Sequence, residues 1–214
     1  MALKGRLKFL HCYIGPDERK IYDLFCDHGL LGSELLKSNK ASVAFNDKRD
    51  HLISNLRLEH GENRMAEFHL CDAQNLHFYE KSLVVMAGVG GLTMIDCFEH
   101  WIESHESTLF KSLEFVVSPH YYTFELRKFL LENGFSYSDQ KLVKDKSQIY
   151  EVSRIKFLAK NANQQLFDKE VWQSFGEVGR ELLSYSQKNL ANKSVMSDWE
   201  KELLMKIKEF MSLT

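Results

Sequence analysis

Carboxylates and a histidine gather in the stretch DLFCDHGLL, residues 23–31. Asp23, Asp27 and His28 follow a short apolar run there and could bind a ligand through charge-assisted hydrogen bonds or contact a reacting base. Alternatively, Asp27 could cap the helix that begins near Gly29, and both roles are compatible. Gly29 is the only glycine of the turn, so the dinucleotide fingerprint G-x-G-x-x-G is missing.

Two further carboxylates each follow a predicted strand. Asp47 ends the segment SVAFND, where such a group can accept two hydrogen bonds from the hydroxyls of a ribose. A solvated loop acid is the alternative. Asp72 follows the next strand, where it could bind a ligand or act as a helix N-cap. Doubly wound α/β proteins bind nucleotide-like cofactors at these strand ends.

Three glycines, Gly88, Gly90 and Gly91, follow the apolar run LVVMA. Glycines at this place let a planar base approach the backbone closely, although a tight turn or a phosphate-binding loop would use them too. No GKS or GKT follows, so a Walker ATP site is not expected. After the next strand, Tyr121 or Tyr122 could form a stacking surface.

The elements that must position these residues alternate along the chain. Apolar runs predict strands, and three- and four-residue spacing predicts helices. The alternation indicates right-handed crossovers and a parallel sheet. The expected strands are 20–25, 42–46, 66–70, 83–87 and 114–118, and the helices between them are 30–38, 49–60, 92–104 and 122–133. Leu3, Leu7 and Leu10 add helical spacing at the start.

After Gly134 the pattern changes. Two strand-like runs, 135–143 and 148–157, flank the charged turn KDKS and predict a β-hairpin that ends the sheet antiparallel. The tail carries two amphipathic patterns, at 171–185 and 196–210, which predict two antiparallel helices. Ser197 and Glu200 form a capping-box signature for the second. We therefore expect a main domain over 1–159 and a helical appendage over 160–214.

Composition argues against several classes of protein. The 214 residues carry a net charge of −2, so the overall charge does not indicate nucleic-acid binding. No apolar run is long enough to span a bilayer, and no signal-peptide pattern opens the chain, so no membrane partner is expected. Four scattered cysteines without a CxxC pair fit a reducing cytoplasm. Nine histidines form no metal-binding pattern, so no metal site is expected.

Four segments in order resemble one family. They are DLFCDHG, LVVMAGVGG, VVSPHYYTFELRKFLLENGF and LVKDKSQIYEV, and Gly5-Arg6-Leu7 and CDAQNL add smaller matches. Together they resemble the bacterial tRNA (adenine-22-N1)-methyltransferases over about residues 3–157. The chain departs from that pattern at Phe25, where the family has glycine, and at Ser82, Ala73 and Ser118.

The resemblance implies a Rossmann-like α/β fold with a seven-strand methyltransferase sheet and a small C-terminal helical hairpin. It implies S-adenosylmethionine (SAM) as cofactor, tRNA as partner and methylation of adenine N1. Asp27 and His28 would be catalytic. The cofactor-binding residues would be Arg6, Asp23, Cys26, Asp27, Asp47, Asp72, Ala73, Ala87 and Gly88.

Two other functions stay open from the residues. One is a degenerate methyltransferase fold that serves as an RNA-binding or interaction module, which Phe25, Ser82 and the slightly acidic charge would favour. The other is a SAM enzyme with a protein or small-molecule substrate. The oligomeric state does not follow from the sequence.

Overall fold

The computed structural model describes residues 3–17, 19–38, 42–104, 107–158 and 165–213. It contains two compact units, residues 1–162 and 163–214. The expected boundary at 159/160, with most of the polar segment 160–165, lies outside the described residues. Among the helices that are described, none has the length and apolar character needed to cross a membrane.

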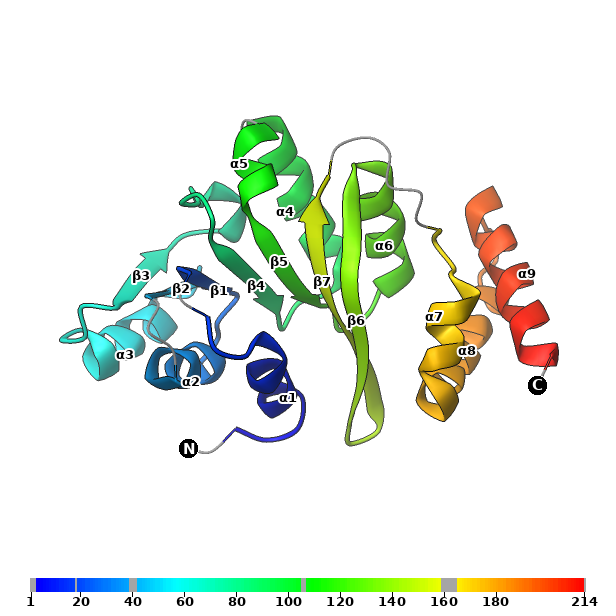
Figure 1. The fold of residues 1–214 in the computed structure, drawn as a ribbon, viewed down its shortest axis with the longest axis horizontal. Helices are drawn as coiled ribbons and strands as arrows, with labels where there is room; N and C mark the ends of the chain where they lie inside the picture. Colours follow the sequence, from blue (N-terminus) through cyan, green and yellow to red (C-terminus); the bar gives the residue numbers. More distant parts are fainter. Residues whose placement is uncertain (1–2, 18, 39–41, 105–106, 159–164, 214) are drawn as a thin grey trace. The chain divides into compact units, whose positions relative to one another are not determined.

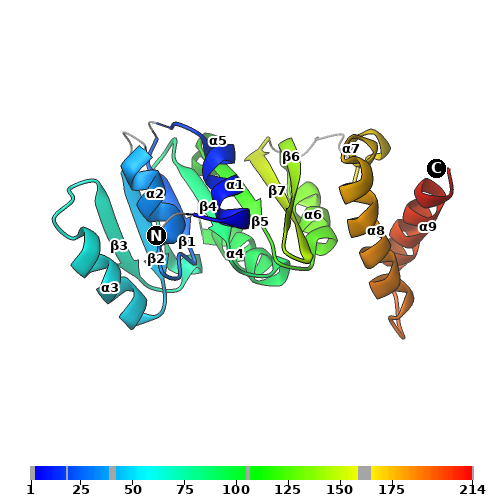
Figure 2. The same cartoon turned by 90° about the horizontal axis from the view of Figure 1, so that it is seen from below.

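The first unit is built on a seven-stranded sheet in the order β3-β2-β1-β4-β5-β7-β6. The five strands from β1 to β5 are parallel, whereas β7 runs antiparallel to both β5 and β6. In Figure 1 and Figure 2, β3 lies at one end of this sheet and the hairpin at the other. The strands are β1 Ile21–Leu24, β2 Val43–Asp47, β3 Ala66–Leu70, β4 Leu83–Ala87, β5 Glu114–Ser118, β6 Phe135–Asp145 and β7 Gln148–Phe157.

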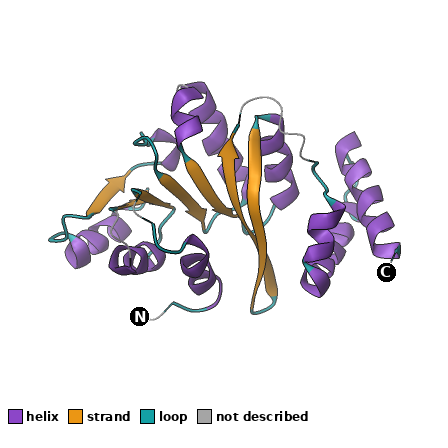
Figure 3. Ribbon diagram, viewed as in Figure 1, coloured by secondary structure: helices purple, strands orange, loops and turns teal. Residues whose placement is uncertain are grey.

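Helices follow the strands in the expected alternation (Figure 3). Successive side chains of the central strands point to opposite faces of the sheet and pack into two separate hydrophobic cores, one on each face. The face with Val85 packs against α1, α2 and α3, and the face with Met86 packs against α4, α5 and α6. These helices are α1 Gly5–Ile14, α2 Leu30–Ser38, α3 Asp50–His60, α4 Gly91–Ser104, α5 Ser107–Ser112 and α6 Thr123–Glu132.

The sequence predictions for this unit are confirmed in their element types and order, including the antiparallel hairpin. Helix α5 and a short 3-10 helix, η1 at Ala73–Asn75, were not predicted. Both are too short to show a helical repeat of apolar residues.

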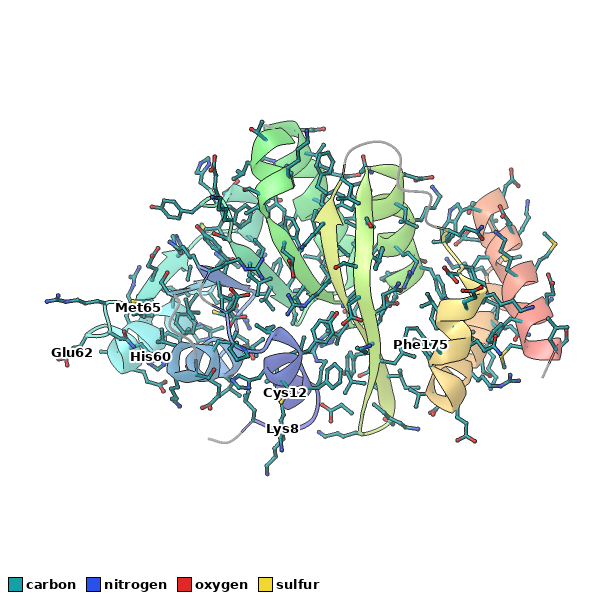
Figure 4. All side chains as sticks on the ribbon, viewed as in Figure 1. Lys8, Cys12, His60, Glu62, Met65 and Phe175 are labelled. Carbon is teal, nitrogen blue, oxygen red and sulfur yellow. The ribbon has the colours of Figure 1, made fainter. Side chains whose placement is uncertain are left out.

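The second unit holds three helices, α7 Lys169–Ser174, α8 Gly176–Ala191 and α9 Asp198–Ser212. The prediction of one helix over 171–185 is wrong, because α7 ends at Ser174 and a separate helix, α8, begins at Gly176. Phe175, which lies between them, is labelled in Figure 4. Gly176 has φ +56, which an uninterrupted helix does not allow. The capping box is confirmed, and the Glu200 carboxylate accepts the Ser197 N–H at 2.7 Å.

Candidate functional site

A cavity of about 760 Å³ opens where β1, β2 and β4 end, and every residue predicted to bind the cofactor or to act in catalysis lines it. This volume is ordinary for a small-molecule or cofactor site. The strands run parallel, so loops far apart in sequence reach the same edge of the sheet. The predicted residues that line the cavity are Arg6, Asp23, Cys26, Asp27, His28, Asp47, Asp72, Ala73, Ala87 and Gly88.

Asp23 is the buried acid of the first strand. Its carboxylate accepts the backbone N–H of Gly32 at 2.9 Å. A Cβ at Gly32 would lie 2.7 Å from that carboxylate, so only glycine lets α2 come this close. Burial raises the pKa of Asp23 to about 7, and the Gly32 hydrogen bond only partly opposes this.

The turn after β1 has a backbone suited to glycine at two positions that hold other residues. Phe25 has φ +55 and Asp27 has φ +52, both in the left-handed region. The turn is held by the Cys26 N–H bonded to the Asn46 carbonyl at 2.9 Å and by the Gly29 N–H bonded to the Cys26 carbonyl at 2.7 Å. The departure at Phe25 therefore changes the side chain that lines the cavity, not the path of the chain.

Asp47 ends β2 and is only 5% exposed. Arg49 binds it with two side-chain hydrogen bonds of 2.9 Å, from Nε to Oδ1 and from Nη2 to Oδ2. The backbone N–H groups of Arg49 and Asp27 add bonds of 3.0 and 3.2 Å. Burial pushes the pKa of Asp47 upward, but these hydrogen bonds outweigh it and lower the pKa. Asp47 is thus an ionised carboxylate that forms an ion pair with Arg49.

The same guanidinium reaches a second acid. Arg49 Nη2 lies 3.1 Å from Asp27 Oδ1, so it bridges the two acids predicted for cofactor binding and catalysis. The Arg49 side chain is 49% exposed and covers Asp47 from the solvent side. Sequence reasoning missed this bridge. The available signal was the spacing Asp47-Lys48-Arg49, which puts two cations directly after the acid.

The end of β3 is fixed from the neighbouring strand. Asn46 Nδ2 donates to the carbonyls of Cys71 and His69 at 2.9 and 3.2 Å. Asp72 stands at the N-cap position of η1, but its side chain makes no capping hydrogen bond. Its carboxylate is instead half exposed, 3.6 Å from Lys48 Nζ. Asp72 therefore presents a carboxylate at the cavity rather than serving as a helix cap.

Ala87 and Gly88 bring backbone to the cavity after β4. Gly88 has φ +114, a conformation that side chains other than glycine rarely adopt. A Cβ built there would meet only the Phe25 carbonyl, at 3.6 Å, so glycine is required by backbone conformation rather than by crowding. The loop matches the expectation of an open approach to the backbone.

Arg6 reaches the cavity from α1, the helix that precedes the sheet. Its Nη1 donates to the Ser118 carbonyl at 3.3 Å, and its guanidinium lies 4.7 Å from the centre of the Tyr150 ring. His120 also lines the cavity, and no prediction assigned it to the site. Burial, together with the positive charge of Arg6, lowers the pKa of His120, which keeps its ring neutral.

Three of the four cysteines, Cys26, Cys71 and Cys97, line the cavity, and burial raises the pKa of each thiol. Cys12 differs, since it is exposed on α1 (Figure 4). In the described part of the chain, no three His, Cys, Asp or Glu side chains are grouped so that they could hold a metal ion.

Comparison with known sequences relates this chain to a protein family. A family model described as "Methyltransferase domain" matches residues 3–153. A Mycoplasma genitalium protein whose name describes it as a tRNA methyltransferase is 32% identical over 146 residues, which are 65% of this chain and 63% of that protein. A Mycoplasma pneumoniae protein of the same description is 29% identical over 145 residues, 62% of this chain and 61% of its own. The match thus spans about three fifths of these relatives.

Solved structures share the fold. TrmK of M. capricolum, in complex with S-adenosyl-homocysteine, superposes with a TM-score of 0.73 at 13% identity, over 100% of this chain and 98% of that chain. The B. subtilis m1A22 tRNA methyltransferase TrmK gives a TM-score of 0.64 at 17% identity, over 99% and 97%. At these identities the likeness establishes the architecture alone.

Proposed function

This chain belongs to the methyltransferase domain family, and from that membership we propose that it transfers the methyl group of SAM to N1 of an adenine in tRNA. The observation that carries the proposal is the cavity at the carboxyl ends of β1, β2 and β4, which gathers every residue expected to bind cofactor. The tRNA part of the proposal draws on the names of the Mycoplasma relatives and of the TrmK structures.

The residues present fit a SAM molecule. Among the described residues, the five aspartates that line the cavity, at positions 23, 27, 47, 72 and 96, outnumber the three lining cations, Arg6, Lys48 and Arg49, which suits a ligand with a sulfonium and an ammonium group. Asp47 would accept the ribose hydroxyls once Arg49 gives way, and Asp72 would accept the adenine amine. The backbone of Ala73, Ala87 and Gly88 would lie against the rings of SAM. Arg6, Asp23 and Cys26 would form the rest of the cavity wall.

SAM supplies the electrophilic methyl group when it is bound. The chain's part is then to align the attacking nitrogen with that group and to exclude water. Adenine N1 already has a lone pair, so no strong base is needed before attack. The base becomes cationic as it is methylated, and the Asp27 carboxylate, with His28 beside it, would stabilise that charge. In folded RNA the base must first be turned outward into the site.

A degenerate, non-catalytic module is the less favoured alternative. In a degenerate protein, the turn after β1 should be lost at the position where Phe25 replaces the family's glycine. Phe25 nevertheless has a left-handed backbone, and Gly88 has a positive φ. The cavity also retains each acid that the proposed chemistry uses.

Transfer of labelled methyl from SAM to bulk tRNA tests the proposal, with nucleoside mass spectrometry to identify the product. We expect incorporation of label and the appearance of 1-methyladenosine. The Asp27→Asn variant is the matched control, since it keeps the shape of the side chain and removes its charge. Label incorporated into protein or into a small molecule, but not into tRNA, would contradict the proposed substrate.

A further inference from the structure

Two loops of the sheet edge are joined beside the cavity. The His120 N–H donates to the Val89 carbonyl at 3.0 Å, and the Gly91 N–H donates to the Tyr121 carbonyl at 2.8 Å. Val89 and His120 both line the cavity, whereas Tyr121 is not among its lining residues. Tyr121 therefore lies next to the cavity, on a backbone fixed from both sides.

The ring of Tyr121 is exposed but is in contact with its neighbours on one side. It lies against Gly90, where a Cβ would be 2.5 Å from its Cε2 atom. The His120 and Tyr122 rings meet it edge to face, with centroids 6.2 and 5.5 Å away. Tyr121 nevertheless leaves 60% of its surface in solvent. One side of the ring is thus supported by protein, and much of the remainder is open.

We propose that Tyr121 is a platform on which a nucleobase of the RNA substrate stacks beside the cavity. The proposal rests on the proposed function and adds to it the residue that receives RNA. A ring already held in place loses little conformational freedom on binding, which favours its use as a binding surface. Stacking on an aromatic face tolerates any base, so the platform adds affinity without choosing a sequence.

The position also fits what the reaction demands of the RNA. Turning a base outward removes it from its neighbours and leaves unstacked faces behind. An aromatic ring beside the cavity can replace one of the lost stacking partners. The cavity beside Tyr121 is lined by charged residues as well as apolar ones, which suits the entry of a nucleotide with its polar groups and its flat ring.

The experiment compares Tyr121→Ala with Tyr121→Phe in the full chain. Tyr79→Ala is the matched control, since Tyr79 is 66% exposed but precedes β4, at the opposite edge of the sheet. Binding of bulk tRNA and the KM for bulk tRNA are measured, and SAM affinity is measured by calorimetry. We expect Tyr121→Ala to weaken tRNA binding roughly 5- to 100-fold with unchanged SAM affinity, and Tyr121→Phe and Tyr79→Ala to stay near wild type.

Gly90→Ala provides a second variant that leaves the tyrosine in the chain. The added Cβ would displace the ring, so we expect weaker tRNA binding here too. If Tyr121→Ala and Tyr79→Ala bind tRNA equally, the platform is refuted while methyl transfer by wild type still supports the proposed function. If wild type binds tRNA through Tyr121 but transfers no methyl group, the platform stands and the proposed function fails. If wild type neither binds nor methylates tRNA, both are overturned.

Discussion

Arg49 holds Asp47 by two parallel side-chain hydrogen bonds of 2.9 Å and extends the same guanidinium to Asp27 at 3.1 Å. Asp47 is the acid expected to accept a ribose. A ligand that takes both of its oxygens must therefore replace Arg49, and doing so also releases Asp27. Under the proposed function, cofactor binding would therefore also free Asp27 from Arg49.

Arg49→Ala should tighten SAM binding by about threefold to tenfold, because the ribose no longer competes with a half-exposed ion pair. Calorimetry at low and moderate salt measures the change. Arg57→Ala, at an exposed position of α3, is the control and should leave affinity unchanged. Weaker binding by Arg49→Ala would mean that the guanidinium contacts the cofactor instead of competing with it.

Asp47→Ala should weaken SAM binding by roughly 2–4 kcal/mol, since two charge-assisted hydrogen bonds are lost. In the double variant with Arg49→Ala, the gain expected from removing Arg49 should vanish, because the two side chains act on the same atoms. A double-mutant cycle by calorimetry tests this coupling. Unchanged affinity in Asp47→Ala would remove Asp47 from the cofactor site.

Asp27→Asn should lower the rate of methyl transfer roughly tenfold or more while changing SAM affinity much less. The reason is that the carboxylate gains importance as positive charge develops on the base. Single-turnover rates under saturating SAM measure the effect. Wild-type turnover in this variant would refute the catalytic assignment of Asp27.

Asp23→Asn should alter the pH dependence of stability in the protein without cofactor. The folded pKa of about 7 lies above the unfolded value of about 3.9, so the folded state retains a proton that the unfolded state has lost. Wild-type stability should therefore fall as the pH rises from about 4 to about 7, by roughly 3–4 kcal/mol at most, and the variant should lack this loss.

Urea unfolding at about pH 5 and about pH 8 measures this difference. Asp50→Asn, an exposed acid at the start of α3, is the control and should follow wild type. An Asp23→Asn protein with the same pH dependence as wild type would show that Asp23 is already charged in the folded state.

The second unit should contribute to RNA binding through its cations. Lys169, Lys188 and Lys208 are exposed on its three helices, and reversing all three to glutamate should weaken tRNA binding with a smaller salt dependence and unchanged SAM affinity. Deleting 160–214 should have the same effect. A truncated protein that methylates tRNA as well as the full chain would assign this unit another role.

The fold was largely predictable because strand and helix leave different apolar spacings. The strand β4 was found with its bounds from the run LVVMA, all of it buried. The hairpin followed from two apolar runs around KDKS. The break at Gly176 was not predicted, because the apolar spacing continues across it and a lone glycine does not reveal its φ.

Site residues could be predicted where their position at the end of a strand places them at the cavity. Asp47 ends β2 and Asp23 lies one residue before the end of β1, and the parallel sheet brings both to one cavity. The Arg49 bridge was missed: the sequence shows two cations directly after Asp47, but which of them reaches Asp47 and Asp27 depends on side-chain conformation. His120 and Asp96 were missed for a similar reason: one lies on a loop and the other on a helix, and only tertiary packing turns them toward the cavity.

The unequal environments of the cysteines make this protein suited to labelling without engineering. Thiolates react with maleimides, and the raised pKa values of Cys26, Cys71 and Cys97 keep those thiols protonated at neutral pH. Cys12 is exposed, so a fluorophore should attach there first. The dye would be carried by α1, the helix that also sends Arg6 into the cavity, and its emission could follow the arrival of RNA in real time.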